Sequence, residues 1–153
     1  MTKSRHVLAV DPGLATGVAL FSIEPGGEPV LLDSWEVKFD TFPVVVRQAF
    51  ATYPDIEVVC EKFTITVETA KKSASPYSLE EIGCLKLMML DAGLPWDNLP
   101  LQLPGNAKAM FPNPKLKKLG YWHRGGAGHA LDAIRHGLLY LVRTGWTPSK
   151  LLD

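Results

Sequence analysis

Apolar residues fall into short runs in the first third of the chain and predict three strands joined by tight turns. Residues 6–11 form a run in which both alternating sets are largely apolar, as is typical of a strand buried on both faces. Residues 17–23 and 30–39 follow as further strands, separated by a turn rich in Pro and Gly at 24–28. Three consecutive strands with such short connections are expected to form an antiparallel meander.

Helical and extended patterns alternate in the next part of the chain. A helix is predicted to begin after Asp40 or Thr41, because apolar residues then recur on one face until residues 53–55 end it. Residues 56–63 form an apolar strand after this helix. We therefore expect this strand to pair in parallel with residues 6–11, through a right-handed crossover.

The second half of the chain adds two more helical patterns and one strand. Residues 64–76 are polar and are expected to form a loop, whereas Ser78 and Glu81 match a capping box that opens a helix reaching Gly93. A short strand at 99–103, a turn of helix at 115–119 and a last helix at 127–144 complete the order. The chain is thus predicted to be a single α/β domain, residues 1–153, with a five-stranded mixed sheet, its first three strands antiparallel, and helices on both faces.

Composition agrees with a globular protein. The 153 residues are 46% hydrophobic and 21% charged, without the bias that marks disorder. No stretch resembles a signal peptide, and no run approaches the ~18 apolar residues of a membrane span. We therefore expect a cytoplasmic protein that does not interact with membranes.

The distribution of charge says more than the net charge, which is zero. No Asp or Glu occurs between residues 98 and 131, and the basic residues of that stretch are Lys108, Lys115, Lys117, Lys118 and Arg124. Lys71 and Lys72 add a second basic pair in the polar loop. A stretch of one sign in a neutral chain favours a surface that meets an anion, although solvated lysines remain an alternative.

Asp11 ends the first apolar strand, where a charged side chain is costly without a partner. Three interpretations compete. The acid can belong to a tight turn with Pro12 and Gly13, to a phosphate-binding loop, or to a metal site. A metal site requires further carboxylates elsewhere in the chain.

Such carboxylates are present at compatible positions. Glu61 lies near the end of the strand expected beside Asp11, which would place the two backbones ~5 Å apart. His129 and Asp132 are three residues apart on the last helix and share a face. If that helix crosses the sheet near the strand ends, the four side chains converge on a site that suits Mg²⁺ or Mn²⁺.

Each residue also has a structural interpretation. Glu61 can be a solvated strand end, Asp132 can favour a helix N-terminus, and His129 can be a polar residue at a helix start. Arg135 and His136 are expected on the polar side of the helix. The joint pattern, rather than any single residue, favours the metal site.

Three motifs together resemble the RuvC-type Holliday junction resolvases. They are Val-Asp-Pro-Gly-Leu-Ala-Thr-Gly at 10–17, Val-Cys-Glu-Lys-Phe at 59–63 and Gly-His-Ala-Leu-Asp-Ala at 128–133. The resemblance implies a ribonuclease H-like fold, a homodimer, and cleavage of four-way DNA junctions with two Mg²⁺ or Mn²⁺ ions per site, leaving 5′-phosphate and 3′-hydroxyl ends. It assigns catalytic and metal-binding roles to Asp11, Glu61, His129 and Asp132.

The resemblance also suggests a phage-encoded member, acting in the cytosol of a bacterial host. Family members have, shortly after this glutamate, a Phe whose ring wedges into the junction. Phe63 lies one position closer to Glu61 than that pattern places it. The lysines of 108–118 are the expected DNA contacts, and the helix at 78–92, with Gly83, Met88 and Met89, is a possible dimer interface.

Three other functions fit parts of the pattern. An exonuclease or flap nuclease can use the same fold. A sugar-kinase or actin-like ATP-binding protein also has Asp-x-Gly after its first strand, but needs two such domains. A DNA-binding module without catalysis would gain nothing from acids that repel phosphate.

Overall fold

The computed structural model describes residues 3–72, 77–124 and 128–149. The strands of this part are β1 (Arg5–Asp11), β2 (Thr16–Ile23), β3 (Val30–Val37), β4 (Glu57–Glu61) and β5 (Leu101–Gln102). The helices are α1 (Phe42–Thr52), α2 (Val67–Lys72), α3 (Tyr77–Asp91), the 3₁₀ turn η1 (Trp96–Asn98), α4 (Pro104–Met110), α5 (Asn113–Leu119) and α6 (His129–Arg143). None of the helices in these ranges has the length and apolar content that a bilayer crossing requires.

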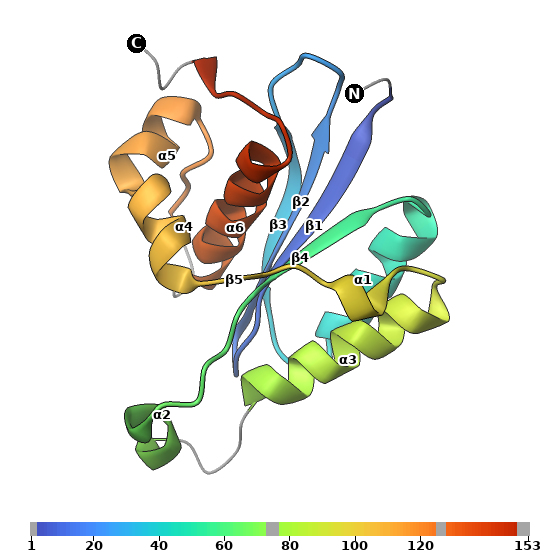
Figure 1. The fold of residues 1–153 in the computed structure, drawn as a ribbon, viewed down its shortest axis with the longest axis vertical. Coiled ribbons are helices and arrows are strands. Elements are labelled where there is room, and N and C mark those ends of the chain that lie inside the picture. Colours follow the sequence, from blue (N-terminus) through green and yellow to red (C-terminus); the bar gives the residue numbers. More distant parts are fainter. Residues whose placement is uncertain (1–2, 73–76, 125–127, 150–153) are drawn as a thin grey trace.

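The strands form one mixed sheet in the order β3-β2-β1-β4-β5 (Figure 1). β1 pairs antiparallel with β2, and β2 pairs antiparallel with β3. β4 pairs in parallel with β1, and β5 in parallel with β4. The predicted meander and the predicted parallel pairing of the fourth strand with the first are both confirmed.

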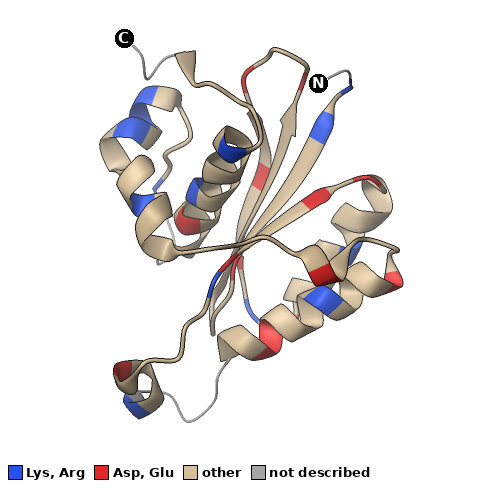
Figure 2. Ribbon diagram, viewed as in Figure 1, with Lys and Arg blue, Asp and Glu red and all other residues tan. Residues whose placement is uncertain are grey.

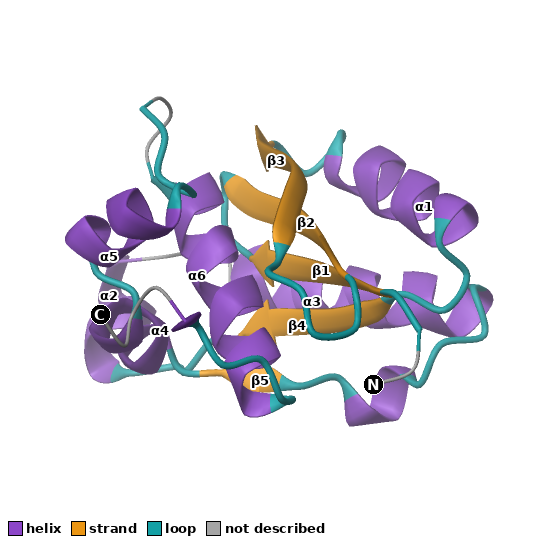
Figure 3. Cartoon of the chain, turned by 90° about the horizontal axis from the view of Figure 1, so that it is seen from above, coloured by secondary structure: helices purple, strands orange, loops and turns teal. Residues whose placement is uncertain are grey.

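Helices cover both faces of the sheet (Figure 3). On β1, Val7 and Ala9 belong to an apolar core shared with α4, α5 and α6, whereas Leu8 and Val10 belong to a core shared with α1 and α3. β1 is therefore buried on both sides, as its apolar run predicted.

Two glycines allow α6 to lie close to the sheet. A Cβ at Gly17 on β2 would meet the His129 carbonyl oxygen at 1.9 Å, and a Cβ at Gly137 on α6 would meet the Phe21 ring at 2.5 Å. Any larger residue at Gly17 would push the first turn of α6 away from β1 and β2. Gly17 pairs with Asp11 across the ladder, so this close approach occurs beside the acid.

The structure differs from the prediction in three segments. The expected loop at 64–76 contains α2, which stands off the body on an extended connection (Figure 1). The Pro-rich segment after β5 forms α4, because Pro104 can occupy the first turn of a helix. α3 begins at Tyr77, so Ser78 lies inside the helix and the predicted capping box is wrong.

Candidate active site

Asp11 and Glu61 end two adjacent parallel strands. Val10 pairs with Cys60, so the next residue of each strand reaches the same edge of the sheet. Asp11 is only 6% exposed, and the Glu61 side chain is 21% exposed. Asp11 and Glu61 are thus neighbours, as predicted.

The first turn of α6 brings two more polar side chains to this edge. Nδ1 of His129 lies 3.3 Å from Oδ2 of Asp11. Asp132, one turn on, is close enough to disfavour the charge of Asp11 and accepts a hydrogen bond from Nη1 of Arg135 at 2.8 Å. The structure therefore brings Asp11, Glu61, His129 and Asp132 together.

The carboxylates perturb one another's protonation. Burial raises the pKa of Asp11 to about 9, and the negative charges of Glu61 and Asp132 add to this effect. Burial also acts against the charge of Glu61, but hydrogen bonds with His136 and Asp11 outweigh it and lower the Glu61 pKa. The carboxylates are thus costly to charge together, and Asp11 is the one that keeps its proton at neutral pH.

In the described ranges, no group of three or more His, Cys, Asp or Glu side chains is arranged so that it could hold a metal ion. Asp11, Glu61 and Asp132 instead hydrogen-bond to His129, His136 and Arg135. The donor set still fits a hard divalent cation, because it offers three carboxylates and an imidazole and because burial, reinforced by the charges of Glu61 and Asp132, raises the pKa of Asp11. Each of these contacts uses one carboxylate oxygen, so the second oxygen of each acid can still meet an ion.

Arg135 and His136 do not lie on a solvated side of α6, so that prediction is wrong. Both are buried. Arg135 donates to the Phe111 carbonyl at 2.8 Å and to Asn113, in addition to Asp132. His136 lies 2.9 Å from Glu61. Its spacing, seven residues after His129 and four after Asp132, places all three near one face of α6 and was the signal that could have identified it.

Glu81 is a second buried polar residue beside the site. It is 1% exposed and accepts hydrogen bonds from the Thr16 hydroxyl and from the Gly13 backbone N–H, the latter at 3.4 Å. Ser78 donates to the Pro12 carbonyl at 3.0 Å. These contacts tie α3 to the loop after Asp11. The sequence signal was an acid in register with the buried Ile82 and Leu85 face.

Most of the predicted basic residues lie on α4 and α5, the helices beside α6 (Figure 2). Lys108, Lys115, Lys117, Lys118 and Arg124 are exposed, and Figure 2 shows basic residues on α4 and α5 next to α6. Lys108 is close enough to favour the charges of both Asp11 and Glu61. Nζ of Lys117 lies 4.5 Å from the centre of the Trp122 ring. Lys71 is exposed on α2, and Lys72 ends that helix, with its side chain outside the described structure.

Phe63 packs against the core between the sheet, α1 and α3. Ile65 and Val67 are the exposed large apolar residues of the same segment, and Leu14 is exposed in the loop after Asp11. The exposed apolar side chains of this segment are therefore at positions other than Phe63.

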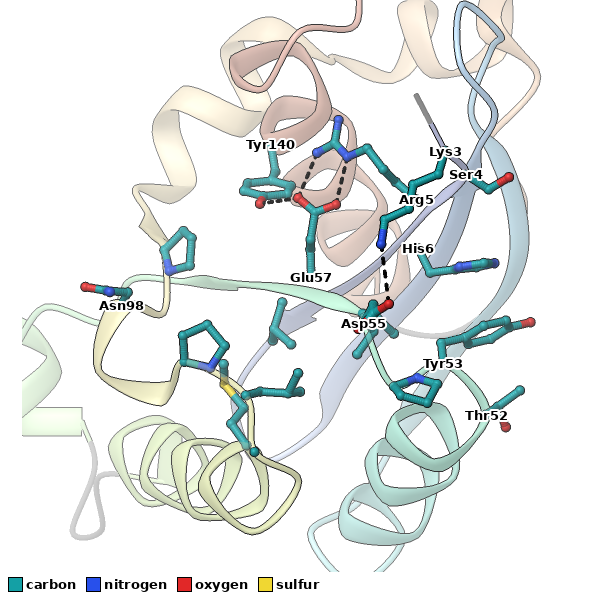
Figure 4. Close-up of a pocket in the computed structure, with 18 residues that line it drawn as sticks. Lys3, Ser4, Arg5, His6, Thr52, Tyr53, Asp55, Glu57, Asn98 and Tyr140 are labelled. Atoms are coloured by element: carbon teal, nitrogen blue, oxygen red, sulfur yellow. Dashed lines mark hydrogen bonds and ion pairs between the residues drawn. The ribbon is translucent and has the colours of Figure 1, made fainter. Parts of the chain in front are cut away.

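The opposite end of the sheet contains a cavity of about 790 Å³ (Figure 4). In its wall, Arg5 donates to Glu57 through Nε at 2.7 Å and Nη2 at 2.8 Å, and Tyr140 donates to Glu57 at 2.7 Å. Glu57 is thus paired with a positive charge, whereas the carboxylates at the other end lie next to one another.

The structure resembles the RuvC protein of Thermus thermophilus. One such structure, RuvC in complex with a Holliday junction substrate, matches with a TM-score of 0.67 at 18% identity, covering 92% of this chain and 96% of that one. A second RuvC structure from the same organism matches with a TM-score of 0.68 at 16% identity, over the same shares of both chains. No protein-family model matches the sequence, and no curated protein matches it significantly. The chain therefore has the RuvC-type ribonuclease H-like fold.

Proposed function

We propose that the protein is a metal-dependent endonuclease that cleaves branched DNA, with four-way junctions as its substrate. The observation that carries this proposal is the convergence of Asp11, Glu61, His129 and Asp132 at one sheet edge, where burial and mutual repulsion raise the pKa of Asp11 to about 9. The fold of RuvC, which has been seen bound to a Holliday junction, supports the choice of substrate. Residues 1–153 act as one nuclease domain in this proposal.

Asp11, Glu61, His129 and Asp132 are the residues that would hold two Mg²⁺ or Mn²⁺ ions. Two such metal ions would supply Lewis acidity for activating water and for stabilising the leaving oxygen. The products of this hydrolysis would be 5′-phosphate and 3′-hydroxyl ends. Asp11 must lose its proton to serve as a ligand, and Arg135 keeps Asp132 directed toward the site.

The exposed basic residues of α4 and α5 are the proposed contacts to the DNA backbone. Lys108 lies nearest the acids, so it would meet phosphates next to the cleaved bond. Lys115, Lys117, Lys118 and Arg124 would extend this surface, and Lys71 and Lys72 would add contacts from α2. Ile65 and Val67, rather than the packed Phe63, offer apolar surface for unpaired bases.

α3 is the proposed interface of a homodimer. Met88 and Met89 are buried in the core, so they are not available to a partner. Leu79, Leu87 and Leu90 are exposed, and Gly83 lies among them with nothing within 4 Å of an added Cβ. A glycine in mid-helix costs roughly 1 kcal/mol relative to alanine, and close approach of a second α3 would account for it.

Cleavage of a synthetic four-way junction tests the proposal, with linear duplex and flap DNA of the same sequence as matched substrates. We expect cuts in the junction with Mg²⁺ or Mn²⁺ and none with EDTA. Preference for the flap or for linear ends would instead identify another nuclease on this fold. Light scattering of wild-type protein and Leu87→Arg would test the dimer, and a monomeric wild type would contradict it.

A further inference from the structure

His136 is a buried imidazole with partners at both ring nitrogens. It is 1% exposed, and its Nε2 lies 2.9 Å from Oε2 of Glu61. Its Nδ1 lies 3.1 Å from Nε2 of Gln102, which is 2% exposed on β5. The ring therefore joins a proposed metal ligand to the neighbouring strand.

The amide of Gln102 is oriented by its own partners. Its Nε2 lies 2.9 Å from the backbone carbonyl oxygen of His136, which can only accept a hydrogen bond. Its Oε1 lies 3.4 Å from Nη1 of Arg143, which can only donate. Both contacts require the NH₂ group to face His136, so the opposite amide orientation is excluded.

This orientation determines which nitrogen of a neutral His136 carries the proton. Because the Gln102 NH₂ group donates, Nδ1 of the ring must accept. The proton is then on Nε2, and the ring donates it in a hydrogen bond to Oε2 of Glu61. A partly exposed glutamate has several rotamers, and this bond from a rigid, buried group selects one of them.

We infer that His136 is a positioning residue, whose Nε2–H, oriented by Gln102, holds one oxygen of Glu61 and presents the carboxylate to Asp11 and to a divalent cation. This inference rests on the proposed function. Partners that orient a metal ligand commonly matter for affinity nearly as much as the ligand itself.

Nitrogen-15 NMR of the wild-type protein tests the ring orientation without any substitution. The two ring nitrogens have different shifts when one is protonated, so the spectrum distinguishes the two neutral forms. We expect the form protonated at Nε2. The form protonated at Nδ1, or a doubly protonated ring, would overturn the inference.

Binding of Mn²⁺ to the wild type, His136→Leu and His136→Gln tests the positioning role. Electron paramagnetic resonance of free Mn²⁺ measures this binding in the absence of DNA. His136→Leu removes the donor, and we expect about 10–100-fold weaker binding, with a similar loss of junction cleavage. His136→Gln keeps an N–H near the same position and should restore most of the affinity.

Tyr140→Phe is the matched control, because it removes a hydrogen bond from α6 to the other β4 glutamate. It should leave Mn²⁺ binding unchanged. Equal binding by His136→Leu and wild type would overturn the positioning role alone, whereas a wild type that neither binds Mn²⁺ nor cleaves DNA would reject the proposed function. If His136→Leu does not fold, Gln102→Leu is the second variant, because it removes the partner that orients the His136 ring. It is expected to weaken Mn²⁺ binding, and unchanged Mn²⁺ binding by Gln102→Leu would also overturn the inference.

Discussion

Two glutamates on β4 occupy corresponding positions at opposite ends of one strand. Glu57 and Glu61 are four residues apart, so both side chains point to the face covered by α6. Each accepts a hydrogen bond from that helix, Glu57 from Tyr140 at 2.7 Å and Glu61 from His136 at 2.9 Å. Their local geometry is therefore similar.

The remaining neighbours make the two ends different. Burial acts against the charge of Glu57, but the hydrogen bonds from Arg5 and Tyr140 outweigh it and lower the Glu57 pKa. Glu61 instead shares its end with Asp11, whose pKa is raised to about 9. A charge paired within the protein stabilises the fold, whereas a carboxyl group whose pKa is strongly raised by burial and by neighbouring acids is typical of a functional site.

The largest expected effect is from Asp11→Asn, which removes the central carboxylate and keeps its shape. We expect at least about a 1,000-fold loss of junction cleavage, because a barrier increase of about 4 kcal/mol has this effect. DNA binding, measured by fluorescence anisotropy, should remain. Glu57→Gln is the control at the other end and should cleave normally; full activity of Asp11→Asn would reject the site.

Gly17→Ala should impair the acid end by moving the first turn of α6. The added Cβ would overlap the His129 carbonyl, and a displacement of about 1 Å at a catalytic group can cost about 100-fold in rate. Gly105→Ala, where nothing lies within 4 Å, is the matched control. Equal cleavage by the two variants would show that α6 tolerates the displacement.

Stability of the metal-free protein should fall as pH rises. The Asp11 pKa is about 9 in the folded state and 3.8 as a free side chain, so between these values the folded state holds one more proton than the unfolded state. Asp11→Asn should remove this decline and raise the melting temperature at pH 8 by roughly 3–8 °C. Thermal melts in EDTA at pH 5, 6.5 and 8 measure the slope, and a parallel slope in the variant would contradict the raised pKa.

Arg5→Met should weaken the opposite end without affecting cleavage. It breaks the pair with Glu57, and the loss of about 1–2 kcal/mol lowers the melting temperature by roughly 3–6 °C. The Glu57 pKa is lowered in the folded state, so the pair stabilises the protein above the free-glutamate pKa and loses this effect as pH falls. The melting temperature of the variant should therefore be below that of the wild type at pH 7, and the two melting temperatures should converge at pH 3.

Lys108→Gln should have the smallest effect, because this lysine is exposed and acts on the acids at a distance. We expect junction affinity to fall several-fold and the slope of log K against log salt to decrease by about 0.9, as for one lost phosphate contact. Anisotropy titrations at several salt concentrations measure both. Lys3→Gln, which changes a lysine in the cavity wall at the opposite end of the sheet, is the control and should leave the slope unchanged.

The sequence alone determined most of the fold. Short turns between apolar runs specify an antiparallel meander, and a helix between two strands specifies a parallel crossover, because these rules act between neighbouring elements. The same rules placed Asp11 beside Glu61, and helical spacing placed His129 beside Asp132. These four positions could be predicted because each depends on local periodicity and on one strand pairing.

Only the tertiary structure decided the partners of the buried polar residues. Glu81 matched a local capping signature, but burial against Thr16 and Gly13 directs it to the loop after Asp11. His136 looked like a residue of a solvated helix face, yet it meets Glu61, 75 residues away in the chain. A buried donor or acceptor must find a partner, and packing of distant segments determines which partner is within reach. Local patterns therefore predicted the acids, and the fold alone revealed what holds them.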